Sequence, residues 1–287
     1  MSMPNLSVIL PAKNESAALG DLLQKVKQVA PDAEIIVVSD GSTDDTVEVC
    51  KAHQIKTISH PYSMGNGAAI KTGARAAQGN ILLFMDADGQ HQPEDIPRLL
   101  EKLAEGYDMV VGARTRNSQA NVHRAAANGF YNRFASWMVG QKIEDLTSGF
   151  RVVKADKFRQ FLYLLPNGFS YPTTITMSFF RAGYSVSYVP IHAPKRIGKS
   201  HMRIARDGVR FLLIIFKIGT LYSPLKLFAP ISFAFFATGL GYYFHTFITQ
   251  HRFTNMSALL FITSVLVFLI GLVSEQITML NYRDSDR

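Results

Sequence analysis

Two carboxylates that follow a short apolar run are the residues best placed to do chemistry in this sequence. Ile81 to Met85 is uninterrupted apolar sequence, and Asp86 and Asp88 come directly after it, two positions apart. The run predicts a buried strand, and open α/β sheets bind ligands beyond the carboxyl ends of their strands. Two hard oxygen ligands at that place suit Mg²⁺ or Mn²⁺ carrying a diphosphate. The alternative is an ordinary turn, in which Asp and Gly are common.

The elements that must position these carboxylates alternate along the first part of the chain. We expect strands at 6–10, 34–39, 54–59, 81–85 and 109–113, and helices at 18–29, 45–53, 66–77, 93–105 and 122–139. This alternation predicts an α/β fold with a mostly parallel sheet. In the turn after the second strand, Asp40 could accept a hydrogen bond from a base N–H or a ribose hydroxyl. The dinucleotide fingerprint and the Walker A sequence are absent, which argues against a nicotinamide dehydrogenase and a P-loop NTPase.

The last part of the chain has a different composition. Residues 228–248 contain no Asp, Glu, Lys or Arg, and residues 256–273 are also uncharged. Each stretch is close to the roughly 20 residues that cross a bilayer, and the short polar segment 249–255 between them predicts a helical hairpin. Lys and Arg are concentrated before and after the hairpin, so the positive-inside rule places the large domain and both termini in the cytoplasm, at the cell membrane.

Between the two regions, residues 203–222 mix apolar and basic side chains. This pattern suits a helix in the membrane interface, and the alternative is a surface helix of the soluble domain. We therefore expect three parts, at 1–201, 202–222 and 223–287. The first five residues have no cationic start or apolar core, which argues against a signal peptide.

The net charge limits the expected binding partners, and the cysteine count limits the possible disulfides and metal sites. The formal net charge is +8, but the basic excess lies beside the predicted membrane segment and no basic-aromatic recognition module is present. Anionic lipids or phosphates are therefore expected as partners rather than nucleic acid. The one cysteine, Cys50, excludes a disulfide within the chain and a multi-cysteine zinc site. The sequence leaves a homo-oligomer open.

Seven segments occur in a recognisable order: PAKNE, SDGSTDDT, GNGAAIKTG, DADGQH, VGAR, TSGFR and KRIGKSH. In that order they resemble the inverting glycosyltransferases of family two with the GT-A fold, and most closely the polyprenyl-phosphate hexose synthases such as dolichol-phosphate mannose synthase. The resemblance covers about residues 5–201. Two positions depart from the family pattern: Ser39 stands where the first Asp of DDGS is usual, and His201 stands where Lys is usual.

The resemblance implies a site for a nucleoside diphosphate sugar. It places the nucleoside on Pro11, Asn14, Glu15 and Asp40. It places the nucleotide phosphates near Lys71, and the metal on Asp86, Asp88 and Gln90. We also assign Ser42 and Ala87 to the donor site.

The implied acceptor, a polyprenyl phosphate, is already an anionic nucleophile at pH 7, because the second pKa of a monoester is about 6. It needs positioning more than a general base. A guanidinium fork matches phosphate oxygens, and we expect Arg114, Arg124 and Arg196 to provide it, although each could instead form a structural or solvated ion pair. Asn128, one helical turn after Arg124, and Ser200 complete the predicted acceptor set.

The sequence thus predicts a membrane-anchored, metal-dependent, inverting transferase that moves a hexose to a dolichyl or undecaprenyl phosphate, with Asp88, Arg114 and Arg124 as catalytic residues. A rival prediction is transfer to a sugar hydroxyl in glycolipid or polysaccharide synthesis, with Asp145 as the base. In the first case Asp145 instead orients Arg151 or the acceptor site. The intact DAD-x-Q sequence disfavours an inactive scaffold. Glucose and mannose, UDP and GDP, all remain open.

Overall fold

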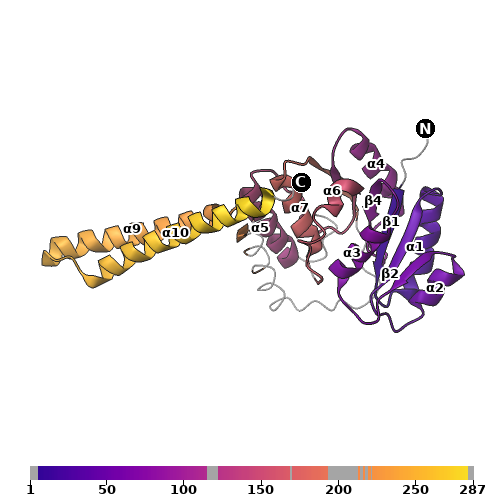
Figure 1. Ribbon diagram of the computed structural model, residues 1–287, viewed down its shortest axis with the longest axis horizontal. Helices are drawn as coiled ribbons and strands as arrows, with labels where there is room; N and C mark the ends of the chain where they lie inside the picture. Colours follow the sequence, from indigo (N-terminus) through magenta and orange to yellow (C-terminus); the bar gives the residue numbers. More distant parts are fainter. Residues whose placement is uncertain are drawn as a thin grey trace. The chain divides into compact units, whose positions relative to one another are not determined.

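The computed structural model describes residues 6–114, 122–168, 170–192, 213, 216, 219, 220 and 222–283, without the side chains of 122–128 and 281–283. The chain divides into two compact units, one with a sheet and one with a helical hairpin (Figure 1). The strands are β1 (Leu6–Ala12), β2 (Glu34–Ser39), β3 (Lys56–Ser59), β4 (Ile81–Phe84), β5 (Met109–Arg114), β6 (Arg151–Lys154) and β7 (Val186–Ile191). The helices of the first unit are α1 (Ser16–Val29), α2 (Thr46–Ala52), α3 (Asn66–Ala76), the 3₁₀ turn η1 (Pro93–Asp95), α4 (Ile96–Ala104), α5 (Val122–Val139), α6 (Ala155–Arg159) and α7 (Tyr171–Arg181).

The seven strands form one sheet in the order β3-β2-β1-β4-β6-β5-β7. All neighbouring pairs are parallel except those of β6, which runs antiparallel to both β4 and β5. The predicted α/β fold with a mostly parallel sheet is confirmed. The reversed strand was not predicted, because its four residues follow the TSGF segment, which has the composition of a turn.

Helices cover both faces of the sheet. Successive strand side chains point to opposite faces, so Val8 and Leu10 pack with apolar residues of α1, α2 and α4, while Ile9 packs with those of α3, α6 and α7. Figure 1 shows α1 and α3 on opposite sides of β1 and β2. The result is a three-layer α/β/α arrangement in which the loops at the strand ends remain available for chemistry.

One predicted helix begins later than expected. The sequence predicted a helix over 93–105, but the chain forms η1 first and α4 begins only at Ile96. Pro97 explains the change, because a proline has no N–H to donate and is tolerated only in the first turn of a helix.

The second unit contains α9 (Pro224–Gln250) and α10 (Asn255–Arg283), which lie side by side and antiparallel (Figure 1). Both helices are long and apolar enough to cross a membrane. Ser232 and Ser264 join them reciprocally: each hydroxyl donates to the other residue's carbonyl, at 2.8 and 2.9 Å. Glu275 of α10 accepts a hydrogen bond from the backbone N–H of Leu225, in the first turn of α9. The predicted interfacial helix at 202–222 lies almost entirely outside the described residues.

Candidate active site

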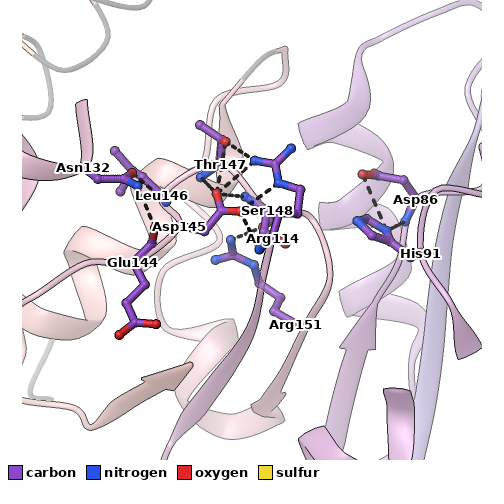
Figure 2. A network of polar contacts seen from close by, with 10 residues as sticks. All are labelled: Asp86, His91, Arg114, Asn132, Glu144, Asp145, Leu146, Thr147, Ser148 and Arg151. Carbon is purple, nitrogen blue, oxygen red and sulfur yellow. Dashed lines mark hydrogen bonds and ion pairs between the residues drawn. The ribbon is translucent and has the colours of Figure 1, made fainter. Parts of the chain in front are cut away.

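The carboxyl ends of β1, β2, β4 and β5 meet the start of β6 at one edge of the sheet. Because β6 is antiparallel, its first residue, Arg151, pairs in register with Phe84 of β4 and with Val111 of β5. The segment that precedes β6 therefore reaches the same edge as the segments that follow its neighbours. Figure 2 shows Asp86, Arg114 and the Asp145 turn at this edge.

Asp86, Asp88 and Gln90 lie on the turn directly after β4, and all three are partly exposed. The Gln90 backbone N–H donates to Asp88 Oδ1 at 3.1 Å, and the positive φ of Gly89 permits the turn. Two carboxylates and an amide oxygen suit Mg²⁺ or Mn²⁺. No group of three His, Cys, Asp or Glu side chains forms a metal site within the described residues. Asp86, Asp88 and Gln90 would leave coordination positions of such a cation for the oxygens of a diphosphate to fill.

His91 lies beneath this turn. The Asp86 backbone N–H donates to His91 Nδ1 at 3.2 Å, and the imidazole ring stacks on Phe150 with the ring centroids 5.1 Å apart. Burial lowers the pKa of His91 to about 4, so the ring is neutral at pH 7. The 4.0 Å approach of His91 Nδ1 to Asp86 Oδ2 is thus not an ion pair at that pH. A buried, neutral, stacked ring suits structural support of the turn.

Arg114, the last residue of β5, is paired with Asp145 through two parallel contacts. Its Nε donates to Asp145 Oδ2 at 2.8 Å and its Nη2 donates to Oδ1 at 2.9 Å. The backbone N–H of Arg114 also donates to Oδ2, at 3.2 Å. Oδ1 further accepts the backbone N–H groups of Thr147 and Ser148, at 3.0 and 3.1 Å. Asp145 is therefore surrounded by donors, and its side chain is only 7% exposed.

This pairing fixes the charge of both groups. Burial raises the pKa of Asp145, but the hydrogen bonds and charge of Arg114 outweigh burial, and the pKa lies below its usual value. Burial likewise opposes the charge of Arg114, and the contact with Asp145 raises its pKa above the usual value. Arg151 donates a hydrogen bond to the Ser148 carbonyl, and the N–H of Ser148 binds Asp145, so any effect of Asp145 on the orientation of Arg151 acts through this turn and stays a prediction (Figure 2).

Asp40, at the end of β2, organises the loop before α3. Its Oδ1 accepts from His60 Nδ1 at 2.8 Å and from the Met64 backbone N–H at 2.7 Å. Its Oδ2 accepts from the Ser63 hydroxyl at 2.8 Å and from the Gly65 backbone N–H at 2.9 Å. The residue is 4% exposed. All four acceptor positions of the carboxylate are engaged, so its predicted contact with the nucleoside would require one of these partners to move.

The turns after β1 and β2 are joined by short polar contacts. Asn14, in a left-handed conformation, accepts the backbone N–H of Thr43 at 2.8 Å, and its own N–H donates to Ser42 Oγ at 3.2 Å. The Ser39 hydroxyl, which replaces the family's usual carboxylate, donates to the same oxygen at 2.9 Å. Glu15 donates its backbone N–H to Thr46 Oγ1 at 3.1 Å. The predicted donor residues Asn14, Glu15 and Ser42 thus lie close together in the turns that follow β1 and β2.

Three other predicted donor residues have distinct surroundings. Pro11 is partly exposed within β1. The ammonium group of Lys71 donates to the Leu165 carbonyl at 3.1 Å and also contacts Asn167 Oδ1. Ala87 is buried in the apolar core, so its backbone is the part that could face a donor. The contact of Lys71 with nucleotide phosphates stays a prediction.

Some contributing residues were not predicted. Asn132 of α5 donates to the Glu144 carbonyl at 2.7 Å and accepts the Leu146 N–H at 3.1 Å, which holds the segment before Asp145. Thr147 accepts a hydrogen bond from Arg114 Nη2. Asn132 could have been identified from the sequence, because it is an amide side chain among the aromatic residues of α5. A threonine in a polar turn carries no comparable signal.

The side chains of four residues of the predicted acceptor site are not described by the structure. Arg196 and Ser200 belong to segments whose placement is not described, as does His201. Arg124 and Asn128 lie on α5, but their side chains are not described. Their roles stay predictions.

Comparison with known proteins agrees with this architecture. The model of "Glycosyl transferase family 2" matches residues 7–162, and that of "GtrB C-terminal hairpin" matches residues 223–280. The glycosyltransferase AglJ of Haloferax volcanii is 27% identical over 82% of this chain and 78% of its own length. The undecaprenyl-phosphate 4-deoxy-4-formamido-L-arabinose transferase of Pseudomonas fluorescens is 27% identical over 83% of this chain and 71% of its own.

Other curated relatives with that last name match over about half of their length. Among solved structures, glucosyl-3-phosphoglycerate synthase from Mycobacterium tuberculosis, in complex with Mn²⁺, UDP and phosphoglyceric acid, superposes with a TM-score of 0.61. It is 20% identical, and the match covers 75% of this chain and 79% of that one. At this identity the likeness concerns the fold.

Proposed function

Because the chain belongs to glycosyl transferase family 2 and is a glycosyltransferase, we propose that it moves a hexose from a nucleoside diphosphate sugar to a polyprenyl phosphate, dolichyl or undecaprenyl. The hairpin match and the undecaprenyl-phosphate transferase among the relatives support a lipid-phosphate acceptor. Transfer inverts the anomeric centre, so an α-linked donor gives a β-linked lipid-phosphate sugar.

The state of Asp145 is the observation that carries the choice of acceptor. A general base needs a free lone pair and a pKa near the working pH. Asp145 has a lowered pKa, is nearly buried, and already accepts hydrogen bonds from Arg114, Thr147 and Ser148. It is therefore poorly suited to take a proton from a sugar hydroxyl. A phosphate acceptor has no such requirement, because it is already ionised.

In this mechanism Asp145 is a positioning residue for Arg114. A bidentate carboxylate holds the guanidinium in one plane and direction at the sheet edge. The positive charge of Arg114 attracts the acceptor phosphate, and we propose that Arg124, Asn128, Arg196 and Ser200 contribute further contacts. Their charge complements a substrate whose polyprenyl tail stays in the bilayer.

On the donor side, we propose that Asp86, Asp88 and Gln90 hold Mg²⁺ or Mn²⁺. Such a cation offsets the negative charge of the departing nucleoside diphosphate. The turn after β4 orients these oxygens, and the neutral His91 ring supports the turn from below without adding a charge. Pro11, Asn14, Glu15 and Ser42 line the neighbouring strand ends, where we place the nucleoside.

We also propose that α9 and α10 span the cell membrane, with the sheet unit and both termini in the cytoplasm. The two helices have the required length and composition, and most of their large apolar side chains are exposed. The excess of Lys and Arg outside the hairpin loop supports this orientation. The anchor keeps the site near an acceptor that cannot leave the bilayer.

The test is single-turnover transfer as the lipid-phosphate concentration is raised to saturation, measured from pH 6 to 9 for wild type and Asp145→Asn. Glu144→Gln, which changes an exposed neighbouring carboxylate, is the matched control. We expect the variant to need more lipid phosphate, because Arg114 loses its partner, while the rate at saturation stays within about tenfold of wild type. A loss on the order of a hundredfold or more in the chemical step, with folding and donor affinity intact, would favour a hydroxyl acceptor with Asp145 as base.

A further inference from the structure

Arg151, at the start of β6, is a fully buried arginine, and the hydrogen bonds of its guanidinium within the described residues go to backbone carbonyls, a threonine and a methionine rather than to a carboxylate. Its Nη1 donates to Thr176 Oγ1 at 3.1 Å and to the Pro172 carbonyl at 3.2 Å. Its Nη2 donates to the Ser148 carbonyl, and its guanidinium lies 5.7 Å from the ring centre of Tyr171. Burying a charge without a direct counter-ion is costly, so this placement calls for a compensating role.

The groups that Arg151 and Tyr171 contact are consecutive. Arg151 binds the carbonyl of Ser148, and the Tyr171 hydroxyl donates to the carbonyl of Gly149 at 3.1 Å. Tyr171 is the first residue of α7, so this helix and the buried guanidinium together hold two successive peptide groups. The Ser148–Gly149 turn is thereby fixed from the interior of the protein.

The other side of this turn faces Asp86. A Cβ added to Gly149 would lie 2.6 Å from Asp86 Oδ2 and 3.1 Å from both Asp86 Oδ1 and Cγ. Distances this short show that the Gly149 backbone packs directly against the Asp86 carboxylate. The position and orientation of Asp86 therefore depend on where the turn is held.

Electrostatic attraction to Arg151 adds to the effect of the packing contact on Asp86. Asp86 and Asp145 are both close enough to Arg151 to interact with it electrostatically. In a weakly polar interior such attraction extends further than in water. The buried guanidinium thus attracts both carboxylates, which lie at the same edge of the sheet (Figure 2).

We infer that Arg151 and Tyr171 are positioning residues for Asp86, acting through the Ser148–Gly149 turn. The inference rests on the proposed function, in which Asp86 holds the divalent cation of the donor site. Neither residue touches the substrate. Their effect is to fix the carboxylate at the end of β4 in the orientation that binds the cation.

The experiment is calorimetric titration of the full-length protein in detergent with Mn²⁺, in the presence of UDP and, separately, GDP. Tyr171→Phe keeps the ring and removes one hydrogen bond, Arg151→Lys keeps the charge, and Gly149→Ala pushes on Asp86. Arg159→Lys is the matched control, because Arg159 also donates to backbone carbonyls, those of Ala74 and Ala77. We expect Mn²⁺ affinity to fall about tenfold in Tyr171→Phe and further in Gly149→Ala, and to stay within about twofold in Arg159→Lys.

A double variant separates positioning from general loss of stability. If Tyr171 acts through Asp86, Tyr171→Phe should have no further effect on Mn²⁺ affinity in an Asp86→Asn background. Tyr171→Phe also serves if Arg151→Lys does not fold. Normal Mn²⁺ binding in Asp86→Asn would refute the metal proposal itself. Weakened binding in Asp86→Asn with normal binding in Tyr171→Phe and Gly149→Ala would refute the positioning role alone.

Discussion

Replacing Asp40 by Asn should destabilise the sheet unit, and the hydrogen bonds that the Asp40 carboxylate accepts set the size of the effect. Each carboxylate oxygen accepts one side-chain donor and one backbone N–H, from Met64 and Gly65 respectively. An amide has one oxygen, so in either orientation its NH₂ group faces one of these backbone donors. That N–H loses its acceptor in a buried place, and the remaining bonds lose their charge. We expect a cost of about 2–4 kcal/mol.

The assay is thermal unfolding of the full-length protein in detergent at pH 7. For a domain of this size, such a cost corresponds to a midpoint roughly 5–15 °C lower. Asp32→Asn, which makes the same change in an exposed turn, is the control and should move the midpoint by about 1 °C at most.

The pH dependence provides a second check. Burial raises the pKa of Asp40, but the hydrogen bonds from His60, Met64, Ser63 and Gly65 outweigh burial and hold the pKa below its usual range. The folded pKa is depressed, so the stabilisation is complete above the unfolded pKa of about 3.9 and is lost as the pH falls below it. The difference between wild type and Asp40→Asn should shrink below about pH 4. An unchanged midpoint at pH 7 combined with a higher donor requirement would instead show that Asp40 binds the nucleoside directly.

Two further substitutions test the division of the site. Asp88→Ala should abolish transfer and remove the dependence of donor binding on a divalent cation, because the cation loses a charged ligand; near-normal turnover that still responds to a chelator would contradict this assignment. Arg124→Ala should raise the requirement for lipid phosphate at least about tenfold while changing donor affinity little, which separate titrations of the two substrates would measure. The reverse result would move Arg124 to the donor side.

Local patterns in the sequence were sufficient to predict the main elements. A strand is built from consecutive residues, so each short apolar run was enough to predict one. The carboxylates that follow Met85 lie at the sheet edge, as expected for residues directly after a strand. The pairing of Arg114 with Asp145 was different. It joins residues 31 positions apart and depends on the reversed direction of β6, a short strand that no periodicity indicates.

The same limit applies on the donor side. A carboxylate in a strand-end turn can bind a ligand or a loop with equal chemical plausibility. Asp40 binds the loop at 60–65 because α3 begins at Asn66 and directs the preceding N–H groups toward it. This meeting of several N–H groups at one carboxylate depends on how the loop packs, and no pattern in the local sequence indicates it. Gly149 is similar, since only the folded chain shows that Asp86 leaves no room for a Cβ.

The reciprocal bonds between Ser232 and Ser264 have a mechanical consequence for the hairpin. They prevent α9 and α10 from sliding past one another without breaking two buried hydrogen bonds. With 27 residues, α9 is about 40 Å long, whereas the hydrocarbon layer of a bilayer is about 30 Å thick. In the membrane-spanning arrangement proposed above, the hairpin should therefore respond to a thinner bilayer by tilting as one rigid rod, and its tilt angle should report the thickness of that bilayer.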